Sequence, residues 1–197
     1  MRIMENVPGT TIAVSPRGDL IAFTASGAGG FGLYVRRTNE LVARRLTDGD
    51  IAARNLTFSP DGKFVAFTEG ASLRKVSVDG GTPVRLSEQV GSTVPYGMVW
   101  TRSDSLIVGS FNGLYSIAAT GGTVRAIPHP DSSATLLGQR WPVLTPDEQF
   151  VIYIPTNQTS GNAPLTAISL RTGKIVSLDI MAAAPLGFAA GRLVYVN

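Results

Sequence analysis

The sequence predicts an all-β protein of the β-propeller class, with four four-stranded antiparallel blades and part of a fifth. Three observations predict this fold: a turn motif that recurs at a nearly constant spacing, an apolar run after each copy, and a composition suited to short strands. The 197-residue chain has 44% hydrophobic residues, 22 glycines and 12 prolines. Repeated four-stranded sheets with a period of about 40–45 residues are typical of propeller blades.

The recurring turn is clearest in its first two copies. Ser15-Pro16-Arg17-Gly18 precedes the apolar run at 20–23, and Ser59-Pro60-Asp61-Gly62 precedes the run at 64–67. In such a turn proline fixes φ, aspartate favours the bend and glycine accepts positive φ. Weaker copies follow, so that the fourth turn positions are 18, 62, 104, 148 and 191, with steps of 44, 42, 44 and 43 residues. The copies at 101–104 and 145–148 lack the glycine, which leaves their turn geometry open.

Each repeat contains four runs that we interpret as strands. A short first run leads into the turn, and the second run is apolar at consecutive positions, as expected for a strand covered on both faces. The third runs are Leu33–Val35, Leu73–Val78, Leu114–Ile117 and Leu165–Leu170. The fourth runs are Ala43–Leu46, Val84–Leu86, Val124–Ile127 and Ile175–Leu178.

The repeat boundaries predict one domain over residues 1–197. The blades fall at approximately 10–50, 51–92, 93–135 and 136–181, with a partial blade at 182–197. Because an unfinished blade would expose strand edges that native proteins usually cover, we expect an incomplete ring that is a fragment of a larger propeller. The alternative is that residues 2–5 add a strand to the last blade and close a small ring.

These residues resemble the TolB-like, WD-related propeller repeat of bacteria, which centres on Ser-Pro-Asp-Gly and an apolar strand ending in Phe. Ser59 to Phe67 matches this pattern well, and Ser15 to Phe23 nearly so. The segment Leu73 to Leu86, together with Arg140-Trp141-Pro142, is most similar to propellers appended to bacterial serine/threonine protein kinases. The resemblance covers the chain from about residue 10 onward. It implies a bacterial propeller, and a TolB-like parent implies an extracytoplasmic location that the sequence alone does not establish.

Residues with catalytic potential are sparse. Gly27 to Gly32 fits G-x-G-x-x-G, but a predicted strand follows it where dinucleotide binding requires a helix, so we interpret it as a hairpin loop. His129 is the single histidine, lies between two prolines and has no G-x-S-x-G nucleophile to serve, which favours a surface loop. With no cysteine and only dispersed carboxylates, we predict no catalytic residues, no cofactor and no metal site.

The charge and hydropathy pattern narrows the expected partners. The net charge is only +3, and lysines and arginines are scattered, so nucleic-acid binding is not expected. No apolar segment approaches 18 residues, which predicts no direct membrane insertion by this chain. A protein or peptide is therefore the expected partner.

Four residues form the predicted binding site. Arg54, Tyr96 and Arg140 occupy the same register before the innermost strand of three successive blades, and Trp141 follows Arg140. We hypothesise that they line one mouth of the central channel and bind an acidic or peptide ligand, since Arg and aromatic residues dominate interface hot spots. The alternative is that they only complete the packing between blades. Trp100 aligns with Phe58 and Val14 and is predicted to be core.

The resulting functional prediction is a non-catalytic propeller module for protein or ligand interaction, acting as the sensor or scaffold part of a larger bacterial protein. Two alternatives stay open. The chain could be the accessory propeller of a prolyl oligopeptidase-like serine peptidase, or part of a TolB-like envelope protein.

Overall fold

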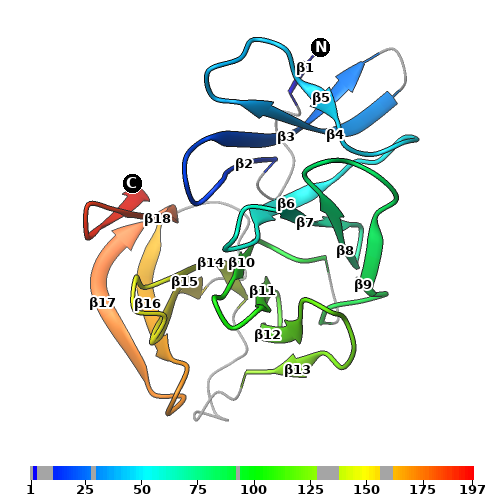
Figure 1. Ribbon diagram of the computed structural model, residues 1–197. Coiled ribbons are helices and arrows are strands. Elements are labelled where there is room, and N and C mark those ends of the chain that lie inside the picture. The colour runs from blue at the N-terminus through cyan, green and yellow to red at the C-terminus, as the bar shows by residue number, and fades with distance from the viewer. Residues whose placement is uncertain (1, 4–10, 28–29, 92–93, 128–137, 156–161) are drawn as a thin grey trace.

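The computed structural model describes residues 2–3, 11–27, 30–91, 94–127, 138–155 and 162–197. These residues form strands and turns without any helix, and the sheets are arranged around a common centre (Figure 1). The prediction of an all-β propeller is therefore confirmed. Nowhere in these ranges is there a helix long and apolar enough to cross a membrane.

The strands group into four complete blades and a fifth of two strands. Blade 1 contains β1 (Arg2–Ile3), β2 (Ile12–Val14), β3 (Leu20–Gly27), β4 (Gly30–Arg37) and β5 (Arg44–Arg45). Blade 2 contains β6 (Arg54–Phe58), β7 (Phe64–Glu69), β8 (Ser72–Ser77) and β9 (Val84–Ser87). Blade 3 contains β10 (Met98–Trp100), β11 (Ser105–Ser110), β12 (Gly113–Ala118) and β13 (Arg125–Ala126). Blade 4 contains β14 (Gln139–Leu144), β15 (Phe150–Pro155), β16 (Ala163–Ser169) and β17 (Ile175–Ala182), and β18 (Ala184–Ala189) and β19 (Arg192–Val196) form blade 5.

The described strands leave the ring open, as predicted. Consecutive strands pair antiparallel within each blade, while β18 and β19 pair only with each other. Closure by the N-terminal strand, the alternative raised by the sequence, is wrong because Arg2 pairs with Ser26 and Ile3 with Ala25 on β3. The reason is geometric: β2 pairs only with residues 21–23, so the rest of the long β3 edge is available to β1.

The core lies between neighbouring blades, because alternate side chains of each second strand face opposite sides. On β7, Val65 and Phe67 pack in the cluster shared with blade 1, whereas Ala66 packs in the cluster shared with blade 3. All three side chains are fully buried. The second strands β11 and β15 divide their residues between two clusters in the same way. This packing explains why the second runs of the sequence are apolar without alternation.

The turn between the first and second strands has a positive-φ residue at its fourth position in all four complete blades, although the turn of blade 3 is one residue shorter than the others. Gly18, Gly62, Asp104 and Glu148 have φ values of 72°, 75°, 59° and 56°. The third and fourth turns therefore keep the positive φ of the first two without a glycine. In blade 5 the equivalent connection is shortened to a hairpin in which Ala190 and Gly191 both have positive φ.

The glycine-rich segment after β3 is a hairpin, as predicted. Gly27 pairs with Gly30, and the strand β4 follows directly, so no helix N-terminus is present there to hold a pyrophosphate. The loop predicted around His129 lies outside the described residues.

Candidate functional site

A cavity of about 640 Å³ lies at the centre of the blades. It is bordered by the innermost strands β2, β6, β10, β14 and β18, which Figure 1 shows around a common axis. Its lining is mainly apolar and includes a residue from each blade, namely Val14, Phe58, Met98, Trp141 and Leu186. The most solvent-accessible of the lining side chains are Ile12, Val14 and Leu186, with exposed fractions of 53%, 58% and 60%.

The innermost strands of blades 2, 3 and 4 share a distortion beside this cavity. Asn55, Gly97 and Trp141 each lie four residues before the first turn position and have φ values of 53°, 88° and 50°. The pairing register shifts at this point in β6 and β14, which is the signature of a bulge. The residues just before the bulge are Arg54, Tyr96 and Arg140. The structure therefore places these three predicted site residues at equivalent positions.

Hydrogen bonds at the bulges connect one blade to the next. The Asn55 amide nitrogen donates to the Pro95 carbonyl at 2.9 Å, and its oxygen accepts the Gly97 N–H at 2.8 Å. The Trp141 N–H donates to the Tyr96 carbonyl at 2.8 Å. A Cβ on Gly97 would lie 2.9 Å from the Trp141 Cα, so only glycine allows blades 3 and 4 to approach this closely. The bulges thereby set the spacing of three consecutive blades.

Arg140 lies between two aromatic rings. Its guanidinium carbon is 4.4 Å from the centre of the Tyr96 ring and 4.5 Å from that of Phe111, and the two rings meet edge to face. The side chain is only 1% exposed. Burial lowers the pKa of Arg140, an effect that Tyr96 partly opposes. Since the ordinary pKa of arginine is above about 12, the group remains a cation that the faces of the rings stabilise.

The predicted site residues occupy different surroundings. Tyr96 and Arg140 are in contact, and Trp141 borders the cavity. Arg54 is half-buried and pairs with Thr68 on β7. Trp100 is buried in the core as predicted, but Val14, its counterpart in blade 1, is mostly exposed at the cavity.

Sequence reasoning missed Asn55 and the cavity residues Ile12 and Leu186. The repeats do contain one indication of the bulge. Asn55, Gly97 and Trp141 share a register position, and both asparagine and glycine tolerate positive φ. Within the described part of the chain, no three His, Cys, Asp or Glu side chains are grouped so that they could hold a metal ion. The mainly apolar lining of the cavity offers chiefly apolar contact to a ligand.

Comparison with known proteins identifies the type of propeller. No protein-family model matches the chain. A stretch of 53 residues, 27% of the chain, is 49% identical to the Tol-Pal system protein TolB of Gluconobacter oxydans (strain 621H), and it covers 12% of that protein. The structure is similar to a putative TolB from Agrobacterium tumefaciens, with a TM-score of 0.72, 16% identity, and coverage of 88% of this chain and 65% of that one.

A second solved structure is also a β-propeller. The Cps50 (Swd1) β-propeller domain of Myceliophteria thermophila matches with a TM-score of 0.69 and 15% identity over 98% of this chain and 65% of that domain. The chain thus has a TolB-like β-propeller fold, and it spans 65% of each of these two solved chains, which is less than two thirds of their length. Similarity to kinase-appended propellers stays a prediction, since none of these matches bears on it.

Proposed function

We propose that this chain is a non-catalytic interaction module that binds an apolar, extended segment of a protein partner in its central cavity. The observation that carries the proposal is the cavity of about 640 Å³ between the innermost strands, with exposed aliphatic side chains on its border. Ligand sites are typically concave, mainly apolar and formed on a rigid scaffold. The interleaved cores between blades supply that rigidity.

The four predicted site residues take distinct roles in this proposal. Trp141 contacts the bound segment directly, because it borders the cavity. Arg140 acts as a positioning residue: it is buried against Tyr96, and the Tyr96 carbonyl accepts the Trp141 N–H. Arg54 is half-buried at the equivalent position in blade 2 and is available to an acidic group on the ligand. The proposal thereby narrows the acidic or peptide ligand expected from the sequence to an extended peptide.

The similarity to TolB favours one of the candidate parents. The stretch that is 49% identical to a Tol-Pal system protein supports a TolB-like envelope protein as the parent of this propeller. Binding of a protein segment, rather than gating of a catalytic domain, is accordingly the function that we infer.

The proposal is tested with a panel of synthetic decapeptides of apolar, acidic and basic composition, added to the ¹⁵N-labelled chain. The two tryptophans give two indole N–H signals. We expect apolar peptides to shift the Trp141 signal and leave that of the buried Trp100 unchanged. Val14→Ser and Leu186→Ser should each weaken binding roughly fivefold through lost apolar contact.

The matched control is Val84→Ser, which changes a similarly exposed valine (55%) on β9, a strand that does not border the cavity. It should leave peptide affinity unchanged. Absence of any peptide-induced shift at Trp141 would refute the cavity as the binding site. Equal weakening by Val84→Ser would do the same.

A further inference from the structure

The loop between β4 and β5 presents two adjacent aliphatic side chains to solvent. Leu41 is 96% exposed and Val42 is 80% exposed, the largest exposed fractions among the large hydrophobic residues that the structure describes. We call these two residues the Leu41–Val42 tip. Exposed single hydrophobic residues are common, but a fully exposed neighbouring pair at the end of a hairpin is not explained by packing.

The equivalent loops of blades 2 and 3 show that this exposure does not arise from the open ring. In all three blades a turn closes with a backbone hydrogen bond, donated by Glu40, Gly80 or Gly121, and three residues then lead into the fourth strand. The tip positions hold Gly81-Thr82 in blade 2 and Gly122-Thr123 in blade 3. These residues are exposed even though Gly80 packs beside Arg44 of blade 1 and Gly121 beside Leu86 of blade 2. The position is therefore always at the outer rim, and only blade 1 carries aliphatic residues there.

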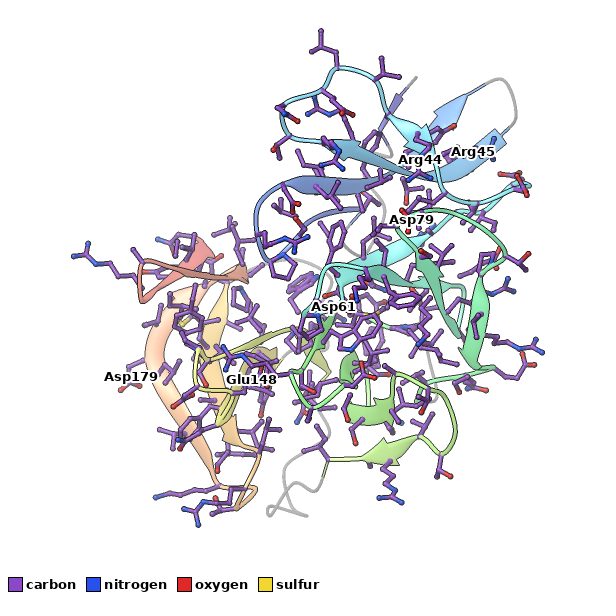
Figure 2. All side chains as sticks on the ribbon, in the orientation of Figure 1. Arg44, Arg45, Asp61, Asp79, Glu148 and Asp179 are labelled. Atoms are coloured by element: carbon purple, nitrogen blue, oxygen red, sulfur yellow. The ribbon has the colours of Figure 1, made fainter. Side chains whose placement is uncertain are left out.

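Three arginines lie close to the Leu41–Val42 tip in the chain, with Arg36 and Arg37 before it and Arg44 after it. Arg36 donates to the Glu40 carbonyl at 2.6 Å, and Arg44 donates to the Asp79 carbonyl at 2.8 Å. Figure 2 shows Arg44 close to Asp79. Arg37 forms an exposed ion pair with Glu40 at 3.7 Å. Backbone carbonyls thus hold two guanidinium groups next to the tip without neutralising their charge.

We propose that the Leu41–Val42 tip docks this protein on the surface of an anionic lipid bilayer. The two aliphatic side chains enter the boundary between headgroups and acyl chains, and the arginines meet the lipid phosphates. A protein interface buries about 800 Å² on each partner, far more than a convex pair of side chains supplies, whereas at a lipid surface the burial of a few apolar side chains adds to the attraction between cations and anionic headgroups. This docking is peripheral and does not require a spanning segment.

The test is co-sedimentation of the full chain with phosphatidylglycerol-rich vesicles and with neutral phosphatidylcholine vesicles, at about 0.1 M salt. We expect binding to the anionic vesicles only. The double variant Leu41→Ser/Val42→Thr should bind at least roughly tenfold more weakly. Arg37→Gln should bind about fivefold more weakly, because one cation near the surface is lost. The matched control Val176→Thr changes an exposed valine on β17, away from the tip, and should bind like the original chain.

Insertion is measured separately with Leu41→Trp, whose emission should shift to shorter wavelength and be quenched by brominated lipids when anionic vesicles are added. Circular dichroism and thermal melting establish that each variant is folded, which the exposure of the changed residues leads us to expect. Failure of the original chain to sediment with anionic vesicles would overturn the proposal and assign the tip to a pocket on a protein partner. Unchanged sedimentation of the double variant would overturn it as well.

Discussion

The turns of blades 1 and 2 differ from those of blades 3 and 4 in the residue that takes positive φ. Gly18 and Gly62 occupy the positive-φ position in the first pair, and Asp104 and Glu148 occupy it in the second. A non-glycine residue in this conformation is less stable by about 1–2 kcal/mol. The acidic side chains offset this cost with contacts that glycine cannot make. Asp104 accepts the Trp100 indole N–H at 2.8 Å, and Glu148 accepts the Arg102 backbone N–H at 3.0 Å.

This difference shows that the turn forms without a glycine, whereas its first residue is of the same chemical type in every complete blade. That residue has a hydroxyl in all four blades: Ser15, Ser59, Thr101 and Thr145. Each hydroxyl accepts the N–H that begins the second strand, at 2.9 to 3.1 Å. The turn is thus built on this hydroxyl in all four blades, and either a glycine or an acidic residue takes its positive-φ position.

We expect the greatest loss of stability when the hydroxyl at the first turn position is removed. Ser59 is buried, accepts the Phe64 N–H at 2.9 Å and donates to Asp61 at 2.6 Å. Ser59→Ala leaves both groups without this partner, so the free energy of unfolding in urea should fall by about 2 kcal/mol. Ser103→Ala removes an exposed hydroxyl that contacts Thr101 and should change it by less than about 0.5 kcal/mol. Equal losses would show that the hydroxyl at the first position has no special role.

The repeated turn also explains how much of the structure could be predicted from the sequence. Each of the four complete blades has a hydroxyl at the start of the turn, a positive-φ residue and a largely buried second strand, so these local requirements recur in the sequence and predict the fold. The burial of Arg140 could not be predicted, because it depends on how closely blade 4 approaches blade 3 at Gly97 and on the ring of Phe111. The exposure of Val14 was missed because it depends on which side of β2 the cavity occupies. Both are properties of the assembled ring that no single repeat encodes.

We expect a smaller change in stability when the acidic residue at the positive-φ position is replaced by glycine. Asp104→Gly relieves the backbone strain of positive φ but removes the acceptor of the Trp100 indole N–H. A hydrogen bond to a charged acceptor is worth about 1.5–3 kcal/mol, so we expect a net loss of about 1 kcal/mol in the free energy of unfolding. Glu148→Gly is the matched variant. Its ion pair with Arg102 is exposed on the arginine side, so its net change should be close to zero. A stabilising Asp104→Gly would show that the Trp100 contact contributes little.

The smallest effect concerns acid stability, where blade 3 differs from the other blades. The Ser59 hydroxyl, followed by the Lys63 N–H, holds the pKa of Asp61 below its ordinary value. Because the folded pKa is the lower one, the stability that Asp61 contributes is present above the unfolded value of about 3.9 and is lost as the pH falls through the folded value. Urea unfolding of Asp61→Asn between about pH 5 and pH 2 should therefore show a shallower decline in stability than the original chain. Blade 3 has Ser103 at this position and no carboxylate, so Ser103→Asn should leave the decline unchanged. If Asp61→Asn declined as steeply as the original chain, the hydroxyl–carboxylate pair would not be a source of acid sensitivity, and the turn would depend on its hydroxyl-to-backbone bond alone.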